Sequence, residues 1–177
     1  MFTENLLFYK EESLIMAFID TIKERAKADK KTIVLPESMD KRTYEAAEKI
    51  LKEGIANLVI IGTPEEIEKY GKGYDISGAT IVDPFNDPNK QKYIDKFVEL
   101  RSKKGVTPEM AKEQMEKDYM YYACLMCKCG DADGAVSGAC HSTGNTIRPA
   151  QFQVSSLWKF QTANSVRTVF LYSLTVL

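Results

Sequence analysis

Residues 131–150 read DADGAVSGACHSTGNTIRPA, and this stretch indicates both the fold and a binding function. Gly134 to Val136 is typical of the end of a short buried strand. The loop that follows carries small side chains, which let a ligand approach the backbone closely. Arg148 and Pro149 then have the form of a helix start, where proline costs no hydrogen bond and N–H groups attract anions. A strand, a loop and a helix are therefore expected here in succession.

Polar groups in the same stretch suit an anion. Arg148 adds a planar, permanent positive charge that matches phosphate. Hydroxyl donors come from Ser142, Thr143 and Thr146. The stretch therefore predicts a phosphate or carboxylate cradle, with a plain polar loop between strand and helix as the alternative.

The preceding residues alternate between helix and strand patterns. Apolar strands are expected at residues 32–35, 58–61 and 80–82. Helices are expected from about residue 18, from Ser38 or Asp40 to Gly54, from Thr63, from Pro88 to Lys104, from Thr107, and over residues 119–129. Continuous apolar strands between helices indicate a parallel sheet covered on both faces, so the predicted fold is a three-layer α/β/α sandwich.

Two groups of charged residues invite a functional interpretation. Arg101 continues the inward line of Tyr93 and Phe97, each four residues on, so it either lies along the surface or points into a cleft. Asp40, Lys41 and Arg42 follow the strand at residues 32–35, where ligands collect in open α/β sheets. A solvated helix start capped by Asp40 explains that second group without a ligand, and is preferred.

The cysteines raise the question of a metal site. Cys124, Cys127 and Cys129 fall in an apolar run that is expected to be helical and buried, where thiols behave as small hydrophobes. Cys140 and His141, the only histidine, could form a catalytic pair, but adjacent side chains usually point apart. No metal and no cofactor are therefore expected, although both readings stay open as alternatives.

Composition excludes several classes of protein. The chain has 177 residues and 44% hydrophobic content, which suits one domain. A net charge of −1 shows no excess of basic residues of the kind that binds nucleic acid. No apolar run approaches the roughly 18 residues of a membrane span, and no secretory signal is visible. We expect a cytoplasmic protein with no nucleic-acid or membrane partner.

Ordered motifs along the chain resemble the phosphate acetyltransferase family. The strand Ala132 to Ala139, His141–Ser142 and the segment Thr146 to Ala150 carry the resemblance first. Further matches, in order, are TIVLPE (32–37), DKRT (40–43), LVIIG (58–62), IVDP (81–84) and ELRSKKG (99–105). Together they cover roughly residues 17–150, and the family chain is about twice as long as this one.

The resemblance implies a fold and a reaction. The fold would be the phosphate acetyl/butyryl transferase fold, which resembles that of isocitrate and isopropylmalate dehydrogenases. The reaction would convert acetyl-CoA and phosphate into acetyl phosphate and CoA without metal, and complete family members are homodimers. Arg101 and Arg148 are implied as catalytic residues, with Ser142, Thr143 and Thr146 binding phosphate. The alternatives are a phosphate butyryltransferase-type enzyme and a catalytically dead fragment.

The two ends of the chain depart from the family pattern. All 25 acidic residues lie in the first 149 positions, although by proportion about five would fall in the last 28. From Gln153 onward a shifted reading frame is compatible with GIISVEIPNCEFGADGVPLFADCA, so residues 151–177 are expected to be an aberrant tail. Residues 1–15 match nothing in the family and are expected to be a non-native leader before Met16. The family-like domain is then residues 16–150.

Overall fold

The computed structural model describes residues 17–154, without the side chains of Thr143 and residues 151–154. Residues 17–28 form a helix. The elements that follow are β1 (Thr32–Leu35), α2 (Lys41–Glu53), β2 (Asn57–Ile61), α3 (Pro64–Gly71), β3 (Thr80–Val82), α4 (Lys90–Arg101), α5 (Pro108–Lys117), α6 (Tyr119–Cys129), β4 (Gly134–Ala135) and α7 (Thr143–Val154). The predictions for residues 1–15 and for the greater part of residues 151–177 concern positions outside the described residues.

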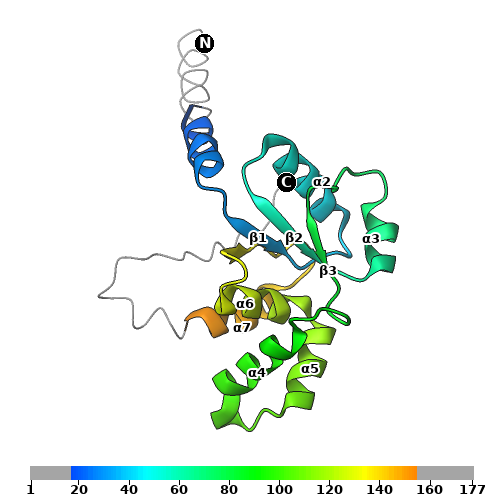
Figure 1. The fold of residues 1–177 in the computed structure, drawn as a ribbon, viewed down its shortest axis with the longest axis vertical. Coiled ribbons are helices and arrows are strands. Elements are labelled where there is room, and N and C mark those ends of the chain that lie inside the picture. Colours follow the sequence, from blue (N-terminus) through cyan, green and yellow to red (C-terminus); the bar gives the residue numbers. More distant parts are fainter. Residues whose placement is uncertain (1–16, 155–177) are drawn as a thin grey trace, which may run out of the picture.

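The four strands form one parallel sheet with the order β3-β2-β1-β4. Thr32 pairs with Asn57 at the start of β1 and β2, and Ile33 pairs with Gly134 on the other side of β1. Helices α2 and α3 lie on one side of the sheet and α4 to α7 on the other (Figure 1). The predicted α/β class and parallel sheet are confirmed.

Side-chain alternation along the strands builds a core on each face of the sheet. Val34, Val59 and Ile61 face α4, α5 and α6, in a cluster that also holds buried aromatic and thioether side chains. Leu35, Leu58 and Ile60 face the other way, toward α2. Because strand side chains alternate between faces, one apolar strand sequence supplies both layers, which is why these strands read as uninterrupted apolar runs.

Side-chain caps fix where the helices begin. Asp40 accepts from Arg42 N at 2.9 Å and caps α2, as preferred from the sequence. Thr63 and Glu66 form the predicted capping box of α3. The Thr107 side chain accepts from Met110 N and caps α5, and Asp118 caps α6. Each cap satisfies an N–H group that has no partner within the helix.

The expected helix of residues 88–104 is shorter in the structure. Helix α4 runs from Lys90 to Arg101, followed by a 3-10 turn over Ser102–Lys104. Gly105 ends that turn with a φ of 70°, a backbone conformation that favours glycine. Arg101 is therefore the last residue of α4 rather than an interior one, and it stands where the chain turns.

The helix of residues 17–28 extends away from the sheet (Figure 1). The helix expected from about residue 18 is present, and its apolar side chains Phe18 and Ile22 are 65% and 48% exposed. Across residues 17–154, no helix is both long enough and apolar enough to cross a bilayer.

Candidate functional site

The candidate site lies where β1 and β4 end side by side. Strands β1, β2 and β3 follow one another across the sheet, and the chain then crosses back to place β4 on the opposite side of β1. In open α/β sheets ligands bind at such a switch point, outside the carboxyl ends of the strands. The segments that leave these two ends, residues 36–40 and 136–142, meet there.

Glu37 is the centre of this meeting point. The residue is 2% exposed, and its carboxylate accepts from four consecutive backbone N–H groups of the opposite loop. Gly138 N and Ala139 N donate to Oε2 at 2.9 and 2.8 Å, and Cys140 N and His141 N each donate to Oε1 at 3.0 Å. The loop that the sequence predicted to cradle an anion therefore wraps a carboxylate of the protein itself.

Hydrogen bonding keeps Glu37 ionised despite its burial. Burial acts to raise the pKa of this carboxyl, but the hydrogen bonds from His141 and from three backbone N–H groups outweigh it and hold the pKa well below its usual value. Each of these donors favours the charged form. Glu37 is thus a fixed negative charge at the end of β1.

His141 bridges Glu37 and a second carboxylate. Its Nδ1 lies 2.6 Å from Glu37 Oε1, and its Nε2 lies 3.4 Å from Oδ1 of Asp118, the cap of α6. Hydrogen bonds to Asp118 and to Glu37 raise the pKa of His141 to about 10. With one carboxylate at each ring nitrogen, the imidazole carries both protons at neutral pH.

Cys140 lies against the same carboxylate. Its Sγ is 3.4 Å from Glu37 Oε1 and 3.9 Å from His141 Nδ1, so both side chains turn toward Glu37 and the expectation that they point apart is wrong. The physical reason is that one buried carboxylate attracts both donors. Burial and the negative charge of Glu37 raise the pKa of the Cys140 thiol to about 12, which opposes a thiolate–imidazolium catalytic pair.

The spacing of these three groups would also allow a metal ion. Glu37, Cys140 and His141 place their ligand atoms within 4.8 Å of one another. Metal ligands must be a thiolate, a neutral imidazole or an available carboxylate. Here the thiol and the imidazole keep their protons, and Glu37 is surrounded by donors, so the arrangement favours an ion pair over a metal centre.

The start of α7 differs from the sequence-based expectation. Arg148 and Pro149 do not begin a helix, because α7 starts at Thr143 and Pro149 lies inside it. Ser142 precedes the helix, with its Oγ accepting from Asn145 N at 3.4 Å and its carbonyl accepting from Thr146 N at 3.0 Å. The serine at the strand-to-helix loop was the available capping signal, and the proline outweighed it in the prediction.

The predicted phosphate-binding hydroxyls take different positions. Ser142 is exposed at the helix start. Thr146 is 7% exposed, and its hydroxyl donates to the Ser142 carbonyl at 3.1 Å. The hydroxyl proton of Thr146 is therefore already engaged by the backbone at the start of α7. Of Thr143 the structure describes the backbone alone, as the first residue of α7. The roles of all three stay predictions.

The two predicted arginines lie on two helices that both pack against α6. Arg101 ends α4 and is half-buried, whereas Arg148 lies on α7 and is exposed. Both act on one phenol of α6: burial and Asp118 raise the pKa of Tyr121, while Arg101 and Arg148 act to lower it. The Tyr121 ring stacks on Phe97 with centroids 5.7 Å apart, which fixes it beside α4. Both arginines thus contribute to the electrostatic environment of one phenol.

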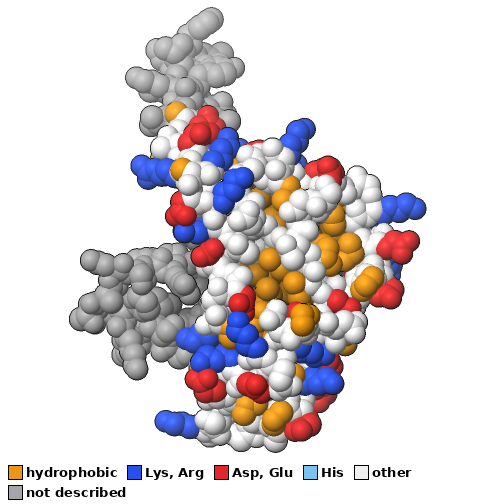
Figure 2. All heavy atoms as spheres, viewed as in Figure 1, with side chains coloured by type: hydrophobic (Ala, Val, Ile, Leu, Met, Phe, Trp, Pro, Cys, Tyr) orange, Lys and Arg blue, Asp and Glu red, His pale blue; other side chains and the backbone are white. Residues whose placement is uncertain are grey.

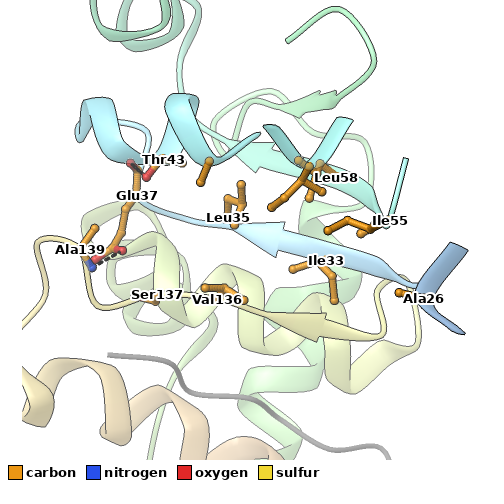
Figure 3. Close-up of a pocket in the computed structure, with 13 residues that line it drawn as sticks. Ala26, Ile33, Leu35, Glu37, Thr43, Ile55, Leu58, Val136, Ser137 and Ala139 are labelled. Carbon is orange, nitrogen blue, oxygen red and sulfur yellow. Dashed lines mark hydrogen bonds between the residues drawn. The ribbon is translucent and has the colours of Figure 1, made fainter. Parts of the chain in front are cut away.

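An apolar groove lies next to Glu37, on the face of the sheet that α2 covers. It encloses about 290 Å³ between β1, β4 and α2, with Leu35, Leu58 and Val136 among its walls. Figure 3 shows Glu37 at one end of the groove, joined to Ala139. In the part of the chain that is described, Ser137 Oγ, which also lines the groove, is a buried hydroxyl with no hydrogen-bond partner. Apolar side chains also gather in the middle of the face shown in Figure 2.

Comparison with known proteins decides the family. A family model described as phosphate acetyl/butaryl transferase matches residues 17–174. The chain belongs to this phosphate acetyl/butyryl transferase family. It is 50% identical over 139 residues to the phosphate acetyltransferase of Thermoanaerobacterium thermosaccharolyticum, and 48% identical over 135 residues to that of Acetivibrio thermocellus. These matches cover 78% and 76% of the chain but 42% and 40% of the relatives, so the chain spans about two fifths of their length.

Solved structures of the transferase family agree with the fold. The crystal structure of a phosphotransacetylase from Streptococcus pyogenes superposes with a TM-score of 0.70 at 34% identity, covering 77% of this chain and 41% of that one. The EutD phosphotransacetylase of Staphylococcus aureus gives the same TM-score at 30% identity, covering 77% and 42%.

Prediction from the sequence missed the residues that hold the loop of residues 136–142 in place. Glu37 entered the sequence analysis only as part of the motif TIVLPE (32–37), and Asp118 and Tyr121 were not singled out. A signal for Glu37 existed, because an acid directly after a buried parallel strand lies at the edge of the sheet where ligands collect. Nothing in the spacing could show that β4 would lie beside β1, so the partners of Glu37 were not predictable.

Proposed function

We propose that the protein containing this chain transfers an acetyl group between CoA and phosphate, forming acetyl phosphate and CoA from acetyl-CoA and phosphate. Family membership supports this, as do two relatives, 50% and 48% identical, that are both phosphate acetyltransferases. We propose an acetyl rather than a butyryl substrate because both relatives are phosphate acetyltransferases. The proposal extends to a cytoplasmic enzyme that uses no cofactor or metal and forms a homodimer when complete.

The observation that carries the proposal is family membership, with Arg101 at the end of α4 and Arg148 on α7, two helices that both pack against α6. In the transfer, a phosphate oxygen attacks the acetyl carbonyl carbon, the C–S bond breaks, and its electron pair leaves with the CoA sulfur, which then takes up a proton. Two guanidinium groups suit this step, because one can hold the phosphate while the other neutralises charge building on the acetyl oxygen. Ser142 and the start of α7 add donors at the same end of the sheet.

Binding of phosphate to the 177-residue chain tests the proposal. We expect weak binding by titration calorimetry, reduced about tenfold or more by Arg148→Ala or Arg101→Ala, since a hydrogen bond to a charged group contributes roughly 1.5–3 kcal/mol. Arg25→Ala, which removes an exposed arginine from the helix of residues 17–28, is the matched control and should leave binding unchanged.

Turnover by the same preparation supplies the second readout. The chain spans about two fifths of its relatives, so we expect little or no acetyl phosphate formation by it. Robust formation that neither arginine change reduces would contradict the assignment of the site.

A further inference from the structure

We propose that Glu37, His141 and Asp118 form a charged clamp that positions the loop of residues 138–142 and, through it, the start of α7 that leads to Arg148. None of the three is proposed to touch substrate. This deepens the proposed function, on which it rests for what the loop presents to a ligand. The three residues act as positioning residues.

The geometry shows why the clamp fixes the loop. Glu37 follows β1, His141 lies in the loop after β4, and Asp118 caps α6, so three separate segments are tied at one imidazole. Four consecutive N–H groups of the loop point at the Glu37 carboxylate at 2.8–3.0 Å. A run of N–H groups can converge on one carboxylate in few backbone conformations, and Gly138 supplies the φ of 117° that this run requires.

The clamp connects directly to the arginine site. His141 is followed by Ser142, whose side chain and carbonyl begin α7. Arg148 lies further along the same helix. Asp118, at the other end of the clamp, begins α6, and α6 carries Tyr121. Displacing His141 would therefore shift the start of α7 relative to α6, against which α7 packs.

Charge balance holds the clamp together. The imidazole contacts a carboxylate at each nitrogen, and the buried Glu37 gains a counter-charge as well as backbone donors. The other charged group at this point is the Asp40–Arg42 pair at the start of α2, with Arg42 also donating to the Ala139 carbonyl. The Cys140 thiol stays protonated beside Glu37, so it adds no further negative charge.

Nuclear magnetic resonance tests the clamp directly, because His141 is the only histidine and its imidazole resonances can be assigned without ambiguity. We expect His141 in the full chain to titrate well above its ordinary value, with Asp118→Asn lowering its pKa by at least about one unit. Asparagine caps a helix as well as aspartate does, so this variant keeps α6. Asp75→Asn, which removes the same charge from an exposed turn, is the control.

Hydrogen exchange separates positioning from a passive ion pair. Asp118→Asn and His141→Gln should speed exchange of the amides of residues 138–141 at least about tenfold, while amides of β2 stay as in the wild type. Histidine titrating at its ordinary value would overturn the clamp, and loop amides unchanged in both variants would overturn its positioning role. If the raised His141 pKa and the faster exchange in the variants are both observed but the wild-type chain binds no phosphate, the proposed function is refuted and the clamp stands.

Discussion

At the scale of single residues, the site is organised by an internal anion. The loop after β4 has the small side chains and turned N–H groups of an anion cradle, and Glu37 occupies it at 2.8–3.0 Å. A carboxylate that accepts several backbone N–H groups is strongly favoured in its charged form. The sequence predicted an anion cradle within residues 131–150, but could not show that N–H groups of this loop bind a carboxylate 101 positions earlier in the chain.

Stability should depend on pH through His141. Its folded pKa, about 10, is raised above the unfolded value near 6.5, so its contribution is complete below pH about 6.5 and is lost as pH rises toward 10. Denaturant unfolding should show the wild type losing at least ~1 kcal/mol over this window relative to His141→Gln. Parallel curves for the two proteins would contradict the assignment.

Glu37 should act in the opposite direction and in a different window. Its pKa is lowered on folding, so its contribution is present above the unfolded pKa of about 4.3 and is lost only as pH falls well below that value. We expect acid unfolding of Glu37→Gln to depend less steeply on pH than that of the wild type. Fluorescence of the unfolding transition between about pH 2 and 5 checks this.

The two glycines of this region should respond oppositely to alanine. Gly138 has a φ of 117°, so Gly138→Ala should destabilise the protein by about 1 kcal/mol or more and loosen the loop around Glu37. Gly144 lies in the first turn of α7 with open space around its Cα, so Gly144→Ala should be neutral or stabilising by up to about 1 kcal/mol. Thermal unfolding of both variants makes the comparison, and equal effects would count against the loop geometry.

At the scale of elements, local signals predicted most helix ends. The caps at Asp40, Thr63 and Thr107 could be predicted from the sequence. A hydroxyl or carboxylate side chain just before a helix with periodic apolar residues accepts hydrogen bonds from the free N–H groups of its first turn. The start of α7 was mispredicted because Pro149 suggested a first turn, whereas the structure places it within the helix. Local capping signals mark all four helix starts, and in the fourth Ser142 supplies the signal that the prediction passed over in favour of Pro149.

The capping box of α3 provides a stability prediction for an element. Thr63 Oγ1 accepts from Glu66 N at 3.3 Å, and Glu66 Oε2 accepts from Thr63 N at 3.0 Å and from Ser38 Oγ at 2.9 Å. Thr63→Ala should cost about 1 kcal/mol of unfolding free energy, while Thr63→Ser should cost little. A denaturant titration in which serine is no better than alanine would show that the cap contributes nothing.

At the scale of the whole molecule, strand order creates the site. The sequence predicted parallel strands covered by helices, but not that β4 would lie beside β1. That neighbour relation depends on long-range packing of α4, α5 and α6 over the sheet, which periodicity in one segment does not report. It brings residues 37, 118 and 141 together.

Turnover in a chimera tests the central claim, that Arg101 and Arg148 of this chain serve acetyl transfer to phosphate. Residues 17–150 would replace the matching segment of the Thermoanaerobacterium thermosaccharolyticum phosphate acetyltransferase, which is 50% identical to this chain over 139 residues. The measurement is the rate of acetyl phosphate formation from acetyl-CoA and phosphate. We predict an active chimera in which Arg101→Ala or Arg148→Ala lowers kcat by about ten- to a thousandfold and Arg25→Ala does not. An active chimera whose turnover is unchanged by both arginine substitutions would contradict the account.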